Sequence, residues 1–245
     1  MAKQGGLGQF LYIGGYDLSG DIGAIQNAGS PRGTLDKTGL NSSAVERVMT
    51  HGGAHMEWRS HFNPSASREH PVLSALPTSD QQVTWGMGTT IGADVFCING
   101  KQINYDGTRE QQGDFTLSVA IEGSSVAVEW GELLTSGGKA THASATSESS
   151  LDGGAGTSAG LAAYLEFFSR ASGTPTFVVE HSTNGSTWAT LLTFSGTGGA
   201  SPFSERKTVS GTVNRYLRAT TNGTFTNAVF SVSVRRGTAQ DDAAY

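Results

Sequence analysis

The segment from Thr135 to Gly160 most constrains how this chain can fold, because almost nothing in it can be buried. It reads TSGGKATHASATSESSLDGGAGTSAG, and its only apolar side chains are Leu151 and several alanines. A segment of this composition cannot bury enough apolar surface to offset the entropy that it loses on ordering. The sequence therefore predicts a mobile linker over residues 135–160, between two halves that are rich in short apolar runs.

The remaining composition indicates small β domains with many tight turns. The chain has 245 residues, with 34 Gly, 6 Pro and only 15% charged residues. The glycines lack the triplet period of collagen, and the aromatic residues lie in periodic runs outside the linker. Two modest domains fit this length. We expect the first over residues 1–134 and the second over residues 161–236, followed by a tail over residues 237–245.

Charge and cysteine content narrow the function classes. The net charge of −5 argues against a DNA- or RNA-binding module, which usually shows a clustered basic face. Cys97 is the only cysteine, so an intrachain disulfide is excluded and folding in a reducing cytoplasm is favoured. The N-terminal residues lack a signal-peptide pattern, and no apolar run approaches the ~20 residues of a membrane span. We therefore expect a protein that is made in the cytoplasm and does not span a membrane.

Period-2 alternation predicts strands in the first half. Residues 54–62 place Met56, Trp58 and Phe62 on one face and charged or histidine side chains on the other. Residues 94–105 and 113–122 alternate in the same way and are joined by the polar turn DGTREQQG. The first half is therefore expected to be a β-sandwich or barrel built around a long hairpin.

Three other segments of the first half have weaker signals. Residues 10–13 form an apolar group between glycines, which is either a first strand or an extended arm. Residues 42–49 fit a short helix that begins at a serine. Residues 70–78 fit a short helix between two prolines.

Short strands at regular spacing fill the second half. They are expected over residues 161–168, 176–181, 188–194, 207–209, 215–220 and 229–235. Turn signals such as Asn184-Gly185 separate several of them. A spacing of about 8–12 residues indicates a jelly-roll or immunoglobulin-like β-sandwich, so the whole chain is expected to be mainly β.

The sequence shows no motif for catalysis or metal binding. His55, Glu57 and His61 share one strand face, but each two-residue step advances ~6.6 Å, which spreads them too far apart for one ion. No zinc spacing, nucleophile elbow or phosphate-binding loop is present, and Cys97 lies in a strand where it packs as an inert apolar residue. We expect no enzyme activity, no catalytic residues, no metal and no cofactor.

Two segments of the second half, FVVEHSTNGSTWATLLTF and VNRYLRATTNGT, resemble galactose-binding-like and carbohydrate-binding β-sandwiches. The resemblance covers about 80 residues and implies the sandwich architecture. It also leaves open a carbohydrate-binding function, with glycan contacts at Trp188 and Tyr216. Because these aromatic positions are scaffold positions in such folds, the sequence does not distinguish sugar-stacking residues from core residues.

Several segments together resemble the major tail proteins, or tail tube proteins, of long-tailed actinobacterial phages. They are LYIGGYDLSGDIG, TLDKTGLNSSAVERV, HMEWRSHFNP, HPVLSALP and INGKQINYDGTREQQGDFTLSVAIEGSSVAVEWGELLT, with RYLRATT and FSVSVRR near the C-terminus. The resemblance spans nearly the whole chain through soft motifs without a catalytic signature. It implies a tube-forming domain in the first half and an exterior β-sandwich in the second.

The same resemblance implies a function in the virion tail. Six copies would join their sheets into a ring, and rings would stack into a tube that conducts DNA at ejection without binding it specifically. The implied partners are further copies of the chain and the tape measure, tail terminator and distal tail proteins, with assembly in the host cytoplasm. Long hairpin strands with exposed edges and a glycine-rich N-terminal arm, both read from the residues themselves, suit contacts between subunits.

The resemblance and the alternation together assign roles to particular residues. Contacts between subunits are expected at apolar residues of the arm and the hairpin, namely Phe10, Tyr12, Phe115 and Leu117, and contacts between rings at the arm and residues 63–80. The lumen is expected to be polar or acidic, because basic side chains would bind the passing DNA. Its candidate residues are Asp114, Glu122 and Glu129. A phase error of one residue would invert these assignments, and a head decoration or minor tail protein remains the other structural alternative.

Overall fold

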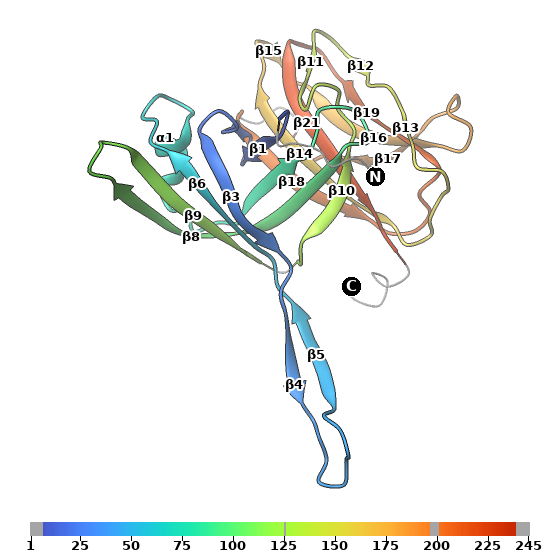
Figure 1. Cartoon of the computed structure of the whole chain (residues 1–245). Coiled ribbons are helices and arrows are strands. Elements are labelled where there is room, and N and C mark those ends of the chain that lie inside the picture. Colours follow the sequence, from blue (N-terminus) through green and yellow to red (C-terminus); the bar gives the residue numbers. More distant parts are fainter. Residues whose placement is uncertain (1–6, 125, 197–200, 239–245) are drawn as a thin grey trace.

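The computed structural model describes residues 7–124, 126–196 and 201–238, and it confirms a mainly β fold. Figure 1 shows two β bodies side by side, with a long hairpin that projects away from both. Within the described residues the only helix is α1 (Glu69–Leu73). The expected tail over residues 237–245 lies mostly outside the described residues. We found no helix in the described part of the chain that is long and apolar enough to cross a membrane.

The described residues of the first half contain ten strands. They are β1 (Phe10–Ile13), β2 (Tyr16–Asp17), β3 (Ile22–Gly29), β4 (Arg32–Asp36), β5 (Arg47–Gly52), β6 (His55–His61), β7 (Gln81–Gly86), β8 (Asp94–Arg109), β9 (Phe115–Gly123) and β10 (Glu129–Leu133). The predicted alternation is confirmed within β6, where Met56 and Trp58 are buried, whereas Phe62 lies beyond the strand and is 39% exposed. The predicted long pair is the β8–β9 hairpin.

In the second half, the part of the chain that the structure describes contains eleven strands. They are β11 (Ala140–His142), β12 (Thr146–Ser147), β13 (Leu151–Asp152), β14 (Leu161–Ser169), β15 (Ser172–Gly173), β16 (Thr176–Ser182), β17 (Ala189–Thr193), β18 (Phe203–Val209), β19 (Tyr216–Asn222), β20 (Phe225–Thr226) and β21 (Ala228–Arg236). The two faces of this sandwich enclose a core of aliphatic and aromatic side chains that includes Phe167, Phe177 and Phe230.

One sheet runs through both halves. Its strands follow the order β18-β14-β21-β10-β8-β7-β1-β2, so β10 of the first half pairs with β21 of the second. A small core with residues of both halves, among them Tyr12, Leu133 and Tyr164, packs at this junction. The expected boundaries of two separate domains stay predictions. The strands of the two halves are joined by the hydrogen-bonded pairing of β10 with β21.

The structure differs from the expected mobile linker over residues 135–160. The segment contains β11, which pairs with β21, and β12 and β13, which pair with β19. His142, Leu151 and Thr135 are buried within it. The prediction was wrong because hydrogen bonds from polar side chains, which apolar content does not count, tie the segment to the sandwich.

Two predicted elements of the first half also differ. Residues 42–49 are not a helix, because Arg47 begins β5 and Val48 pairs with Leu35 of β4. Long-range strand pairing here overrides a weak local preference for helix. The helix expected over residues 70–78 is shorter and ends at Leu73, and Leu76 beyond it adopts a left-handed backbone conformation (φ 44°).

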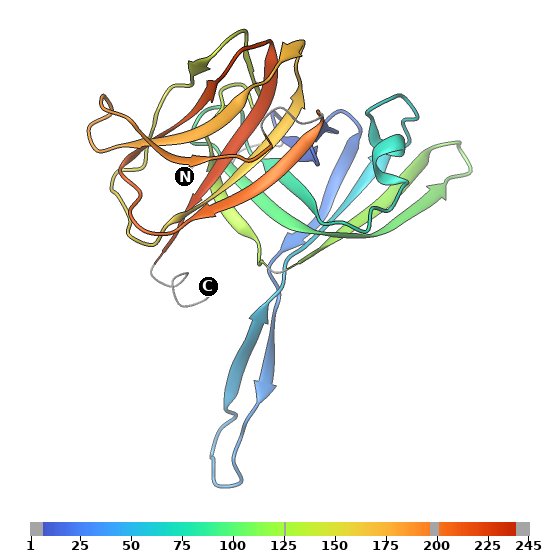
Figure 2. The same ribbon diagram turned by 180° about the vertical axis from the view of Figure 1, so that it is seen from behind.

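The N-terminal apolar group is a strand and not an extended arm. Residues 10–13 form β1, which pairs with β7 and β2 inside the sheet. All four side chains of β1 are at most 5% exposed. The element that projects is instead the β4–β5 hairpin, which leaves the body in both views (Figures 1 and 2).

Candidate assembly surfaces

A four-stranded antiparallel sheet dominates the first half. The distal part of β8 pairs with β9, β9 pairs with β6, and β6 pairs with β3. Among the described strands, β3 has a partner on one side only, and so does β8 from Lys101 onward. The sheet therefore has two unpaired edges of similar length, which are sites where another chain can add a strand.

The inner face of this sheet packs on the core. It carries Met56 and Trp58 of β6 and Leu117, Val119 and Ile121 of β9, all buried. The buried carboxylate of Glu69 ties helix α1 to this face. It accepts hydrogen bonds from Ser60 Oγ of β6 (2.9 Å) and Tyr105 Oη of β8 (3.1 Å). Burial raises the pKa of Glu69, and burial together with the adjacent Glu69 raises the pKa of Tyr105.

The outer face of the sheet is polar. Cross-strand register places His55, Glu57, Arg59 and His61 of β6 beside Glu122, Ala120, Ser118 and Thr116 of β9, and beside Lys101, Asn104, Asp106 and Thr108 of β8. This outer face carries two basic side chains, Arg59 and Lys101. It also carries four carboxylates, those of Glu57, Asp106, Asp114 and Glu122. Its formal charge is therefore negative at neutral pH.

Two of the three predicted lumen residues lie on this outer face. Glu122 is half exposed, and its Oε1 lies 2.7 Å from His55 Nδ1. Asp114 is also half exposed, and its Oδ1 lies 4.0 Å from His61 Nδ1. Each carboxylate thus faces a histidine of the neighbouring strand.

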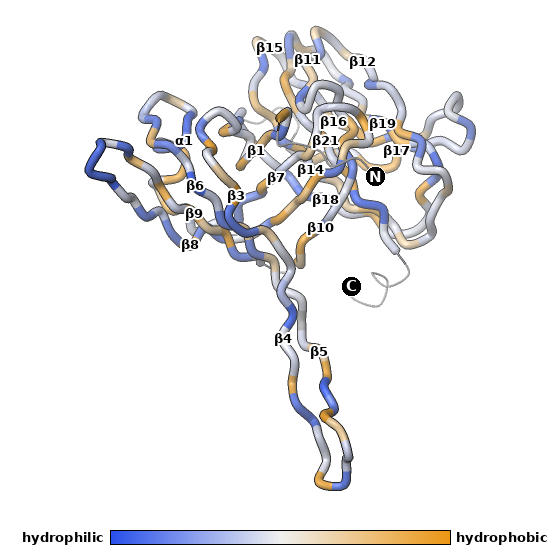
Figure 3. Tube along the Cα trace, in the orientation of Figure 1, coloured by the Kyte–Doolittle hydropathy of each residue, from blue (hydrophilic) through white to orange (hydrophobic). Residues whose placement is uncertain are grey.

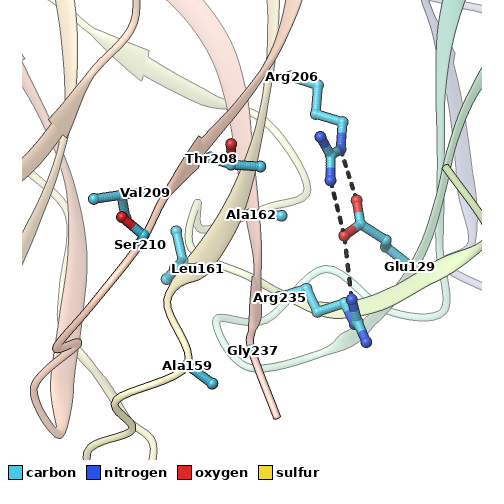
Figure 4. A pocket seen from close by; sticks show the side chains of 10 residues that line it. All are labelled: Glu129, Ala159, Leu161, Ala162, Arg206, Thr208, Val209, Ser210, Arg235 and Gly237. Carbon is cyan, nitrogen blue, oxygen red and sulfur yellow. Dashed lines mark hydrogen bonds and ion pairs between the residues drawn. The ribbon is translucent and has the colours of Figure 1, made fainter. Parts of the chain in front are cut away.

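Glu129, the third predicted lumen residue, lies elsewhere. Its side chain is 3% exposed and is held between Arg206 of β18 and Arg235 of β21, with N–O distances of 2.7 and 3.2 Å (Figure 4). Tyr164 Oη donates a further hydrogen bond to Glu129 Oε2. Glu129 therefore joins the two halves of the chain, beside a cavity of about 170 Å³. Alternation along β10 could not reveal this, because the partners lie in the second half.

The predicted contact residues are mostly interior. Phe10 and Tyr12 are buried in β1, where their rings stack at 4.4 Å, and Leu117 faces the core. Phe115 is 37% exposed and packs against Phe62 at the end of the β8–β9 hairpin. Of these four, only Phe115 has substantial exposed surface for a partner.

The predicted glycan contacts are half buried beneath arginines. The Arg218 guanidinium lies 4.2 Å from the ring centre of Trp188, and the Arg215 guanidinium lies 4.9 Å from that of Tyr216. Trp188 is therefore at the surface and not in the core. A sugar that stacks on either ring would compete with the guanidinium for that face.

The projecting β4–β5 hairpin is the main feature that sequence reasoning missed. Its large apolar side chains are exposed, namely Leu35, Leu40, Val45, Val48 and Met49, and Figure 3 shows hydrophobic positions along its length. Leu35 and Val48 are cross-strand partners and share one face. The runs RGTLD and RVMTHG could have been recognised as a strand pair, but the turn between them carries no strong hairpin signal.

The described residues include no group of three or more His, Cys, Asp or Glu side chains that could hold a metal ion. No family model matches the chain, and no curated protein matches its sequence.

Distant likenesses to solved structures were found. One match is to the tail of an empty GTA particle with C6 symmetry. It covers 53% of this chain and 98% of the GTA chain, with 15% identity and a TM-score of 0.39. The SPP1 Dit protein, described as a hub adsorption apparatus, covers 93% and 98%, with 8% identity and a TM-score of 0.35. The phage p2 baseplate in its activated conformation with Sr covers 91% and 97%, with 7% identity and a TM-score of 0.36. At these identities and TM-scores we draw no functional conclusion from the likenesses.

Proposed function

We propose that this protein is a structural subunit of a bacteriophage tail, which self-assembles into hexameric rings that stack into the tail tube. The observation that carries the proposal is the four-stranded sheet with two unpaired edges, β3 and distal β8. An exposed edge of this length is a liability in a monomer and is used in an assembly. The resemblance of the sequence to tail tube proteins supports the same function.

The strand directions are compatible with ring closure. All three pairings in the sheet are antiparallel, so the edge strands β3 and β8 run in opposite directions. A rotation about an axis roughly parallel to the strands preserves these directions. The β8 strand of a neighbouring copy therefore lies antiparallel to β3. Repetition of this contact would give a closed antiparallel barrel without edges.

The outer face of the sheet suits the wall of a DNA channel. In the ring it would become the lumen, and Asp114 and Glu122 would lie on it with Glu57 and Asp106. Phosphate groups are attracted mainly by clustered lysine and arginine. A face with more carboxylates than basic groups would let DNA pass without specific binding.

The β4–β5 hairpin suits contacts between rings. It continues the direction of β3 and β6 beyond the end of the sheet (Figures 1 and 2). An isolated two-stranded hairpin is at best marginally stable in water, so its exposed apolar side chains call for a partner surface. Tape measure, terminator and distal tail proteins would meet the tube at its two ends, in the virion.

Electron microscopy of the purified protein tests the proposal. We expect rings and stacked tubes at high protein concentration. The double variant Leu35→Thr with Val48→Thr introduces β-branched side chains that suit a strand, but it removes an apolar cross-strand pair of the hairpin. We expect this variant to form rings that stack poorly. Thr190→Ala, at an exposed position on β17, serves as the control. A wild-type protein that stays monomeric at high concentration would overturn the proposal.

A further inference from the structure

We infer that the β8 edge of the subunit carries an apolar knob and the β3 edge carries a groove that receives the knob of a second copy. The knob is formed by Leu76 and Ile103. The groove is lined by Phe10, Ile22, Ala24, Ile25 and Trp85. The inference rests on the ring assembly proposed above and names the side-chain contact that closes it.

The knob lies beside the unpaired edge of β8. Ile103 is the extra residue of a β-bulge between Gln102 and Asn104, and it is 55% exposed. Leu76 is 45% exposed and lies in the loop after α1. This loop is held to the edge at both ends, because Gln102 Nε2 donates to Leu73 O (2.9 Å) and Lys101 Nζ donates to Thr78 O (3.0 Å). Both apolar side chains are therefore presented next to the edge strand.

The groove opens between the other edge of the sheet and the layer behind it. Ile22 and Ile25 of β3 point to the core side, since they pair with Ser60 and Trp58 of β6. Trp85 of β7 forms part of the opposite wall, and its indole N–H donates to Gln9 Oε1 (3.3 Å). The groove has a volume of about 310 Å³, roughly twice the ~150 Å³ that accommodates a benzene-sized group.

A second copy of this chain is the occupant that the topology favours. Knob and groove lie at opposite edges of one sheet, so one chain cannot bring its own knob to its own groove. Complementary surfaces at different places on one molecule produce a head-to-tail contact, which closes into a ring when the rotation permits. Because closed barrels require neighbouring strands to be staggered, the knob need not start level with the groove.

Loss of the knob should weaken ring closure. The variant Leu76→Ser with Ile103→Thr removes two exposed apolar side chains and is expected to raise the protein concentration needed for rings by about tenfold or more. Sedimentation velocity measures this concentration, and thermal unfolding of the dilute protein checks that the fold is kept. The control, Trp130→Ser on β10, also removes an exposed apolar side chain (55% exposed) but lies on neither edge strand, so it should leave ring closure unchanged.

Disulfide trapping tests which surfaces meet. One preparation carries Leu76→Cys and another carries Ile22→Cys, which lines the groove on the core side, and the native Cys97 is buried and silent. After the two are mixed at assembling concentration and mildly oxidised, we expect mixed disulfide dimers. Thr190→Cys, at an exposed position on β17, replaces Ile22→Cys in the control mixture and should give none.

The outcomes separate this inference from the proposed function. Rings from the wild type together with weakened rings and mixed dimers from the variants would support both. Wild-type rings that persist unchanged in the knob variant, or mixed dimers no more abundant than in the control, would overturn the knob-and-groove contact alone. A wild type that never forms rings would overturn the proposed function and the inference with it.

Discussion

Glu129 shows how a single carboxylate can bind together distant parts of this chain. Its side chain is almost fully enclosed, yet both carboxylate oxygens are met by arginines from two strands of the second half. Such a buried charge is tolerated only while its partners remain in place, because removal of one partner leaves an uncompensated charge in a medium of low polarity. The exposed pair of Arg215 with Asp152, with N–O distances of 2.6 Å, has comparable geometry but is surrounded by water.

Substitution at these two carboxylates should separate the effects of burial and of pairing. Glu129→Ala removes the carboxylate that pairs with the largely buried Arg206 and is expected to lower the free energy of unfolding by about 3–5 kcal/mol. Asp152→Asn removes an exposed ion pair and is expected to change stability little. Chemical denaturation of both variants measures the difference, and equal losses would contradict this account.

Among the elements, the polar segment 135–160 is held by hydrogen bonds more than by apolar packing. His142 lies at its centre, with Nδ1 2.7 Å from Thr221 Oγ1 and Nε2 2.8 Å from Glu148 Oε1. The second oxygen of Glu148 accepts a hydrogen bond from the backbone N–H of Ser136 (3.0 Å). These contacts connect the beginning and middle of the segment to β19 and satisfy polar groups that would otherwise be costly to bury.

Removal of the His142 ring should therefore loosen this segment first. His142→Ala removes the hydrogen-bond partner of Glu148 Oε1, at a cost of about 1–3 kcal/mol for this largely buried group. The Thr221 hydroxyl keeps its hydrogen bonds to the backbone of Thr146. We expect faster hydrogen exchange over residues 136–152 with little change in β8 and β9. Ser144→Ala, at an exposed position of the same segment, is the control. Unchanged exchange in His142→Ala would show that backbone pairing alone orders the segment.

At the scale of the whole molecule, a second buried carboxyl group, that of Glu166 in β14, connects the two halves. It accepts hydrogen bonds from Gly15 N (2.6 Å), Gln82 Nε2 (2.9 Å) and Thr84 Oγ1 (3.2 Å), all in the first half. At Gly15 (φ +85°) the two halves approach so closely that a Cβ would lie 2.4 Å from the backbone N of Phe203. Burial raises the pKa of Glu166 from 4.5 to about 8.

The raised pKa of Glu166 predicts how the stability of the whole chain depends on pH. A carboxyl group with a higher pKa in the folded state contributes stability that is fully present below about pH 4.5 and is lost as pH rises through about 8. The effect is roughly 1.4 kcal/mol for each pKa unit. We expect the melting temperature to fall between pH 5 and 9, and to fall less in Glu166→Gln, which cannot ionise. Parallel pH profiles for the two proteins would contradict this prediction.

Much of the fold was predictable from local pattern. Period-2 alternation identified β6 and the β8–β9 hairpin, because these strands bury one face regardless of which strand lies beside them. The same alternation placed Glu122 and Asp114 on a solvent-exposed face. Regular spacing and turn signals identified the main strands of the second half. The serine signal was wrong for the helix over residues 42–49, because strand pairing with β4 overrides it. Alternation misplaced Glu129, because its ion pair with Arg206 depends on a residue far away in the chain.

The sequence by itself determined that this chain folds as β-sheets and which faces of its long strands are apolar, since side-chain direction alternates along any strand. Only the tertiary structure decided that one sheet joins the two halves, that residues 135–160 are ordered, and that β3 and distal β8 are edges without a partner among the described strands. These features depend on hydrogen bonds and contacts between residues far apart in sequence. Such pairings are selected by the geometry of the assembled molecule, and a local pattern carries no record of which distant partner completes it.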